Sequence, residues 1–189
     1  MPSETPPRLH GDLAIWLLIL VEMLTFALLF GTFAIARARE PALFAASQAT
    51  LDLRFGGLNT LLLVSGSAAV ALAVQALRED RRRRALAGWG LALACAAGFL
   101  TLKSVEFAAK FAAGVDLTTN TFYMFYLVLT GFHFLHVLVG AVMIAALGLF
   151  TARGAYGADD VHAPETGAAF WHMVDLLWIV LFPLVYVMR

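Results

Sequence analysis

The sequence predicts an all-α integral membrane protein, a bundle of five transmembrane helices. Three observations predict this fold class: of 189 residues, 61% are hydrophobic and only 14% are charged, and the mean hydropathy is +0.83. A soluble domain is roughly half apolar and about a quarter charged, so one globular core could not bury this apolar surplus. The composition therefore excludes a soluble enzyme and indicates a membrane as the surrounding solvent.

Charge and cysteine usage exclude further classes of protein. Thirteen basic residues balance thirteen acidic ones, so the chain lacks the basic surface that binds nucleic acid. Cys95 is the only cysteine, which excludes an internal disulfide, a CxxC redox pair, a CxxCH haem attachment and a thiolate zinc cluster.

Five apolar stretches are long enough to cross about 30 Å of hydrocarbon, which takes roughly 20 residues of helix. Backbone polar groups at that depth must be paired within the segment, so helices are expected. The first stretch is too long for a signal peptide, follows no basic cluster and carries Glu22 in its middle. The chain, 1–189, is expected to form one membrane domain, with loops at 37–56 and 159–165. The predicted spans are 13–36, 57–77, 85–108, 121–152 and 166–188.

The orientation follows from the loops. The short connection at 78–84 reads Arg-Glu-Asp-Arg-Arg-Arg-Arg and is the densest basic run of the chain. Short loops rich in Lys and Arg stay cytoplasmic, so we expect a cytoplasmic amino terminus and a periplasmic carboxyl terminus. We interpret the run as a topology signal rather than as a site for lipid head groups or a partner. With Arg8 and Arg153 this side holds seven basic residues, against five on the other: Arg37, Arg39, Arg54, Lys110 and Arg189.

Ionisable residues inside the spans carry the functional information. A charge in hydrocarbon costs about 2.5–3.5 kcal/mol on insertion scales, so each such residue is expected to have a partner. The residues concerned are Glu22, Glu106, His133, His136, His172 and Asp175.

Two carboxylates have specific expectations. Glu22 lies ten residues after Asp12, or about 15 Å of helix, close to the bilayer midplane. It is expected to be neutral or to meet a donor, and to face another helix, a water-lined cavity or a partner rather than lipid. It either packs or handles protons, and both readings stay open. Glu106 lies between Lys103 and Lys110 at spacings that allow intrahelical ion pairs.

The histidines allow two interpretations. His133 and His136 share one helix face, as do His172 and Asp175, whose carboxylate could fix the tautomer of an imidazole. We favour hydrogen bonding over metal binding, because the Glu-x-x-His pairs of di-iron bundles are absent. Haem ligation needs only one histidine on each of two helices, so ligation through His133 and His172 remains an alternative.

Two packing features are also expected. Gly90, Ala94 and Gly98 form a stripe of small residues, which predicts a close approach of two helices. Tyr123 and Tyr126 at the start of the fourth span suit an aromatic belt at the membrane interface.

Motifs in the last two spans are similar to those of a known family. Residues 130–137 read TGFHFLHV and are followed by Gly140, similar to a T-G-x-H-x-x-H-V-x-x-G helix. Glu165, the WHMVD run at 171–175 and Trp178 are similar to an E…W-H-F-V-D-x-x-W ending. These patterns resemble the subunit III family of haem–copper oxidases.

The resemblance extends over all five spans, in order. Glu22, followed by Phe26 and Phe30, resembles the membrane glutamate of that family. The Asn-Thr pair at 59–60 resembles the opening of its next helix, and the Lys-x-x-Glu pair at 103–106 the end of the following one. Mitochondrial-type members have seven helices, and this chain corresponds to the last five.

The resemblance implies a five-helix bundle of subunit III type in a bacterial inner membrane. It implies a non-catalytic accessory subunit that docks on a catalytic haem–copper, or haem and non-haem iron, subunit, stabilises it and supports its proton uptake. Haem and metal are expected only in that partner, and phospholipid between the helices. Residues 39–44 and 123–126 look more like the accessory E subunit of nitric oxide reductase systems than like quinol oxidase subunits.

No catalytic, metal-binding or cofactor-binding residue is expected in the chain. Besides an accessory subunit, a small membrane cytochrome stays open, whereas a stand-alone transporter would need discontinuous helices or internal repeats, and neither is visible. The final acceptor, oxygen or nitric oxide, also stays open. The predicted intramembrane polar network comprises Glu22, Lys103, Glu106, His133, His136, Glu165, His172 and Asp175.

Overall fold

The computed structural model describes residues 13–158 and 160–188. Five of its helices are long and apolar enough to cross a membrane, the last being α6 continued by η1, which confirms the predicted all-α membrane bundle. Arg8, Asp12 and Arg189, which enter the topology and midplane arguments, lie outside the described residues. The elements are α1 (Leu13–Arg39), α2 (Pro41–Gln48), α3 (Leu53–Arg78), α4 (Arg82–Ala112), α5 (Thr121–Arg153), α6 (His162–Phe182) and the π-helical turn η1 (Pro183–Val187).

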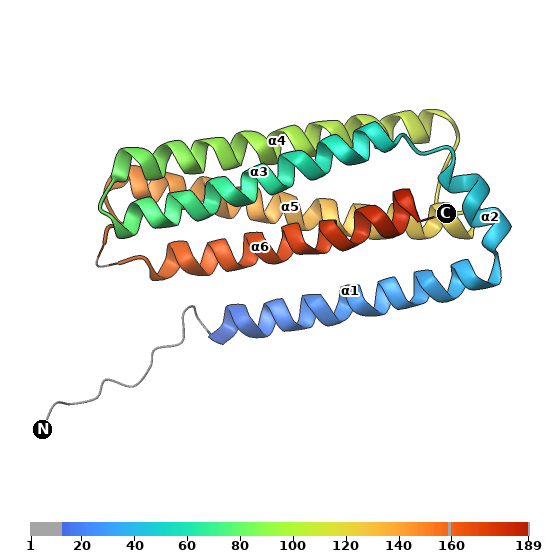
Figure 1. The fold of residues 1–189 in the computed structure, drawn as a ribbon, viewed down its shortest axis with the longest axis horizontal. Helices are drawn as coiled ribbons and strands as arrows, with labels where there is room; N and C mark the ends of the chain where they lie inside the picture. The colour runs from blue at the N-terminus through green and yellow to red at the C-terminus, as the bar shows by residue number, and fades with distance from the viewer. Residues whose placement is uncertain (1–12, 159, 189) are drawn as a thin grey trace, which may run out of the picture.

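Four of the long helices form a closed bundle, and α1 lies outside it. Helices α3, α4, α5 and α6 pack in that order around the bundle, with α6 returning to α3 (Figure 1). Helix α1 runs beside α6, touches α5 and α6, and is linked to the bundle through α2. Its buried residues are Phe26 and Phe33. Most of the apolar surface of α1 is therefore left for lipid or another protein.

Local sequence signals set several helix ends. Asp52 precedes α3 and caps it, because its carboxylate accepts a hydrogen bond from the Arg54 backbone N–H at 2.8 Å. Asn120 does the same for α5, accepting from the Tyr123 backbone N–H at 2.9 Å. Such caps satisfy backbone donors that a helix start leaves unpaired. Helix α5 ends at Arg153, and the next residue, Gly154, has a φ of 81°, the left-handed conformation that glycine adopts without strain.

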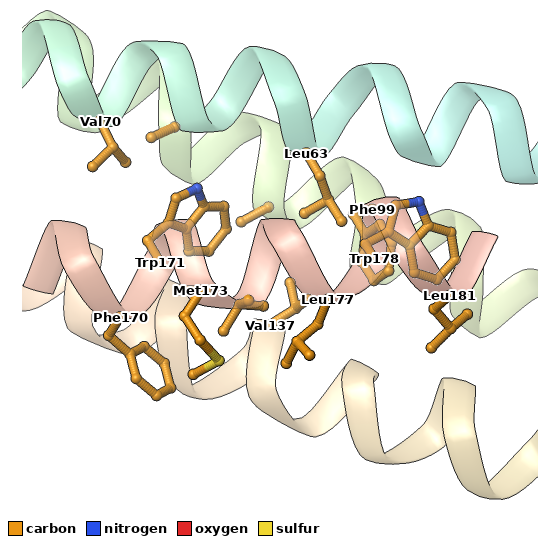
Figure 2. Packing of buried hydrophobic residues seen from close by; sticks show 14 of the residues in the cluster. Leu63, Val70, Phe99, Val137, Phe170, Trp171, Met173, Leu177, Trp178 and Leu181 are labelled. Atoms are coloured by element: carbon orange, nitrogen blue, oxygen red, sulfur yellow. The ribbon is translucent and has the colours of Figure 1, made fainter. Parts of the chain in front are cut away.

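The aromatic side chains of α6 fill the bundle centre. Figure 2 shows Trp171 and Trp178 on the side of α6 that faces α3, and Phe170 and Met173 on the side that faces α5. Both tryptophans are almost completely buried. Burying such large rings stabilises the bundle and fixes the rotation of α6 about its axis.

The predicted stripe of small residues meets α3 at Gly98 but not at Gly90: a Cβ at Gly98 would lie 3.3 Å from a methyl group of Leu62. Among the described atoms, none lies within 4 Å of a Cβ built at Gly90. A Cβ at Gly88 instead would lie 2.8 Å from the Cβ of Ala73 and 2.9 Å from the carbonyl oxygen of Ala69. The closest approach to α3 is thus at Gly88, two positions before Gly90. Small residues occupy both faces of α4, so sequence spacing alone cannot choose between them.

The expectation of loops at 37–56 and 159–165 is wrong in part. Helix α2 lies within the first segment, because Pro41 suits a first helical position and Phe44 is buried. The Phe44 ring lies 5.3 Å from that of Phe33 and 5.5 Å from that of Phe122, measured between centroids. In the second segment, α6 already begins at His162. Helix α2 and the first turn of α6 are not long apolar stretches, so a search for membrane-spanning hydropathy does not reveal them.

Candidate functional site

A buried ion pair at one end of the bundle anchors a cluster of polar side chains. Lys103 Nζ and Glu106 Oε2 lie 3.0 Å apart on α4, and the two side chains are 0% and 8% exposed. The hydroxyls of Tyr126 and Tyr186 each donate to Glu106 Oε1 at 2.7 Å. Lys103 donates to these hydroxyls in turn, at 2.6 Å to Tyr186 and 3.3 Å to Tyr126. A buried ion pair is tolerated only when further hydrogen bonds satisfy it, and this cluster meets that condition.

Aromatic rings enclose the ammonium of this cluster. An ammonium close to a ring face is attracted by the ring quadrupole, more strongly where water is excluded. The ring centroids of Tyr126, Phe107, Tyr186 and Trp178 lie 4.8, 4.9, 5.3 and 5.9 Å from Lys103 Nζ. The charge of Lys103 is therefore held by α4, α5, α6 and η1 together, which ties these elements to one another.

The neighbouring residues correct two expectations. Lys110 does not pair with Glu106 and donates to the Thr50 carbonyl oxygen at 3.1 Å. The interfacial belt predicted for Tyr123 and Tyr126 is wrong, because both rings are buried inside the bundle. The Tyr123 hydroxyl shares a hydrogen bond with the Thr50 hydroxyl at 2.7 Å, so the polar ends of both tyrosines meet protein rather than head groups.

Glu22 faces α5, as expected for a carboxylate near the midplane. Its Oε2 atom lies 3.1 Å from Nε2 of His136, and the two side chains are 19% and 11% exposed. The two atoms are at ion-pair distance without hydrogen-bond geometry, which a rotation of the Glu22 carboxylate would supply. Nδ1 of His136 lies 2.8 Å from the Phe132 carbonyl oxygen. Since a carbonyl only accepts, Nδ1 carries a hydrogen, and Nε2 is left to face Glu22.

His133 has a different environment from His136, one turn away. It is fully buried, and within the described part of the chain neither ring nitrogen has a hydrogen-bond partner. Its ring centroid lies 5.1 Å from that of Trp178, 5.7 Å from that of Phe99 and 6.5 Å from that of Phe26. The sequence predicts a hydrogen-bonded histidine here, whereas the structure packs it as an aromatic side chain.

His172 and Asp175 on α6 face α3. Nδ1 of His172 lies 2.6 Å from the hydroxyl oxygen of Ser67, a partner that sequence motifs do not indicate. Asp175 is 7% exposed, and its Oδ1 atom has no hydrogen-bond partner among the described residues. His172 thus bonds to Ser67, and among the described residues no direct hydrogen bond joins it to Asp175.

Glu165 belongs to the opposite end of the bundle. Its Oε1 atom accepts from Arg78 Nη2 at 2.7 Å and from Nε at 3.0 Å, which ties the start of α6 to the end of α3. Arg82 ties α4 to α5 nearby, donating to the carbonyl oxygens of Thr151, at 2.8 Å, and Ala152. The eight residues predicted as one network therefore form separate groups. The rotation of each helix about its own axis decides which neighbouring helix its polar side chains face.

Nothing in this geometry favours haem ligation by two histidines. His133 is enclosed by aromatic rings, whereas His172 is exposed and binds Ser67. The groove of about 450 Å³ that His172 lines does not include His133. In the described ranges, no three His, Cys, Asp or Glu side chains are placed to hold a metal ion. The arrangement can neutralise buried charges, share a proton between Glu22 and His136, and fix helices to one another.

The sequence motifs of different spans meet in space. Trp178 Nε1 donates to the Thr60 hydroxyl at 2.9 Å, which joins the last motif to the Asn-Thr pair of α3. Asn59 is fully buried, with no hydrogen bond to its amide from any described residue. A Cβ at Gly140 of α5 would lie 2.8 Å from the Trp171 ring of α6. The motifs thus form one packed interior.

Five spanning helices around buried, paired charges define a multi-pass membrane protein whose polar residues hold helices together. The family model for cytochrome c oxidase subunit III matches residues 11–189. The chain belongs to this family, which confirms the resemblance seen in its motifs.

Individual relatives agree with this assignment. The chain is 32% identical to cytochrome c oxidase subunit 3 of Synechocystis sp., over 98% of this chain and 82% of the relative. It is 25% identical to cytochrome bo(3) ubiquinol oxidase subunit 3 of Pseudomonas aeruginosa, over 92% of this chain and 82% of the relative. It is also 29% identical to heme-copper oxidase subunit I+III of Aeropyrum pernix, over 92% of this chain and 22% of that longer protein.

Proposed function

We propose that the chain is a non-catalytic accessory subunit of a haem–copper respiratory oxidoreductase. The observation that carries the proposal is the family match over residues 11–189. The Aeropyrum pernix relative bears the name of subunit I and subunit III together. We therefore propose a catalytic subunit of the haem–copper type as the partner of this chain, and that haem and metal belong to this partner.

The exposed face of α1 is suited to such a contact. Leu20, Leu24 and Leu28 recur on this helix at a spacing of four and are 66%, 62% and 64% exposed. Large exposed apolar faces mark protein or membrane contacts. The opposite, buried side of α1 carries Glu22, which faces His136 of α5, so α1 itself lies between this carboxylate and a subunit packed on the leucines. The proposed support of the partner's proton uptake, in a bacterial inner membrane, therefore rests on the family match.

The electron acceptor is suggested by the relatives, which are named as oxidases of cytochrome c and of ubiquinol. We propose oxygen as the final acceptor of the parent complex. The similarity of residues 39–44 and 123–126 to nitric oxide reductase accessory subunits favours nitric oxide as the second candidate.

Membranes with and without this chain test the proposal. We expect its removal to lower both the amount of assembled catalytic subunit and the rate of oxygen consumption, and re-expression of the full chain to restore both. If nitric oxide consumption falls while oxygen consumption is unchanged, nitric oxide rather than oxygen is the final acceptor of the parent complex. Unchanged rates for both gases would refute the accessory role.

A further inference from the structure

The pair formed by Glu22 and His136 lies deep in the spanning part of the chain but is not closed off from its surroundings. His136 is close to the middle of α5, 15 residues after Thr121 and 17 before Arg153. The two side chains keep 19% and 11% of their surface exposed, whereas Lys103 of the other buried pair is 0% exposed. Ionisable residues at this depth face protein or a water-filled cavity, because hydrocarbon cannot solvate them. The fold of this chain alone therefore leaves the pair incompletely covered.

The uncovered part of Glu22 is its second carboxyl oxygen. Oε2 is buried against His136, whereas Oε1 stays accessible and accepts no hydrogen bond from any described residue. Acyl chains carry no hydrogen-bond donor, and lipid head groups lie about 15 Å away from the bilayer midplane. A donor for this oxygen therefore has to come from water or from another protein.

Glu22 belongs to a row of side chains along α1, here called the α1 seam, that has the spacing of a helix–helix contact. Its members are Leu18, Glu22, Thr25, Leu29 and Thr32, which are four, three, four and three residues apart, as in heptad packing. Leu18 is 42% exposed, Thr25 is half-buried and Thr32 is exposed. The hydroxyls of the two threonines donate to carbonyl oxygens of their own helix, at 2.9 Å and 3.0 Å. Within these five described residues, the seam therefore offers acceptors but no free donor.

The α1 seam is distinct from the leucine face of α1. Leu24 and Leu28 follow Glu22 by two and six residues, which places them about 120–160° around the helix from it. The seam lies instead on the side of α1 that meets α5, where Val139 follows His136 by three residues and is 52% exposed. A helix packed along the seam would therefore lie against both α1 and α5.

We propose that a transmembrane helix of the catalytic partner packs along the α1 seam and donates a hydrogen bond to Glu22 Oε1. A lipid tail would fit Leu18 and Leu29, but it offers no donor to the acceptors between them. Hydroxyl, amide and indole side chains do, and such groups join helices inside membranes. The partner thus contacts α1 from two sides, at the leucine face and at the seam. That the occupant is the catalytic subunit rests on the proposed function.

Photo-crosslinking in native membranes tests the contact. p-Benzoylphenylalanine replaces Val139, Leu24 or Leu61 of the tagged full chain, one position at a time, and the products are probed for the haem-carrying subunit. Leu24 reports the leucine face, and Leu61 is a control of equal exposure, 66% against 62%, on α3, which packs on α4 and α6. We expect a crosslink to the catalytic subunit from Val139 and Leu24, and none from Leu61.

The other outcomes separate this contact from the accessory role. A crosslink from Leu24 without one from Val139 would overturn the seam contact and leave the accessory role intact. No crosslink from either position would contradict both. A crosslink from Val139 to a second copy of this chain or to another protein would refute the catalytic subunit as occupant. Equal crosslinking from Leu61 would mean that no defined contact exists.

Two substitutions at Glu22 test the hydrogen bond itself. Glu22→Leu removes the acceptor and leaves a donor of the partner unpaired, which should weaken binding of the catalytic subunit about 10-fold. Glu22→Gln keeps a carbonyl oxygen and should change the affinity less than about 2-fold. Dissociation of the detergent-solubilised complex from the immobilised tagged chain measures both. The isolated Glu22→Leu chain should unfold at the same denaturant concentration as the wild type. If it is destabilised as strongly as the complex is weakened, Glu22 acts only within the chain and the proposal fails.

Discussion

Trp171 of α6 packs directly on the backbone of α5 at Gly140, where a Cβ would lie 2.8 Å from Cε3 of the indole. Each residue belongs to a motif of its own helix, and the contact explains why the two patterns occur together. The indole occupies the volume of the missing side chain, so α5 and α6 approach more closely there than two ordinary helices could.

Substitutions at the glycines of α5 test this contact. We expect Gly140→Ala to lower the free energy of unfolding by about 1–3 kcal/mol, since it overpacks a filled interior. Gly131→Ala on the same helix is a matched control, because a Cβ there meets no described atom within 4 Å. Its greater helix propensity should stabilise the chain by up to about 1 kcal/mol. Denaturant titrations of the purified chain in mixed micelles, followed by circular dichroism, measure both. Equal effects at the two glycines would contradict the packing account.

Lys103 should be the most sensitive charge of the chain. Lys103→Met leaves the carboxylate of Glu106 buried without its cation, and breaking a buried pair in this way costs about 3–5 kcal/mol. The double variant Lys103→Met/Glu106→Leu removes both charges and should recover much of that loss. Lys110→Met, which removes a hydrogen bond to Thr50, should cost at most about 1 kcal/mol. The same unfolding titration compares the three. A double variant less stable than Lys103→Met would show that the charges act independently.

The sequence predicts the helices of this fold more completely than its polar contacts. Apolar length alone locates the five spans, and i,i+3 spacing predicts the Lys103–Glu106 pair. Tyr186 joins that pair from η1, 80 residues away from Glu106, and no local pattern indicates such a contact. His133 and His136 share a helix face, yet one is enclosed by rings and the other meets Glu22. Helix rotation and packing decide these environments.

Glu22 distinguishes a scaffold from a proton path. Glu22→Gln keeps the shape and hydrogen-bonding capacity of the side chain but removes its titratable proton, whereas Glu22→Ala also opens a cavity beside His136. If Glu22 supports proton uptake, both substitutions should lower the steady-state turnover of the intact complex several-fold. The unfolding free energy of the Gln variant should stay that of the wild type. Full turnover of Glu22→Gln together with weakened assembly of Glu22→Ala would assign a packing role only.

The orientation of the chain is open to a direct check. We expect the turn at 78–84 to be cytoplasmic, because it is the densest basic run of the sequence, and the end of η1 to be periplasmic. Reporter fusions after Arg84 and after Met188 should give opposite signals. Fusions that report the same side would mean that one of the five helices does not cross the membrane.

The account depends most on where the haem resides. Affinity purification of the tagged full chain from native membranes, with the absorption spectrum recorded before and after the subunits are separated, tests this directly. We expect a haem-containing catalytic subunit to co-purify in equal amount, and the haem Soret band to remain with that subunit. A Soret band of equal stoichiometry on the separated chain itself would contradict the accessory role and identify a small membrane cytochrome instead.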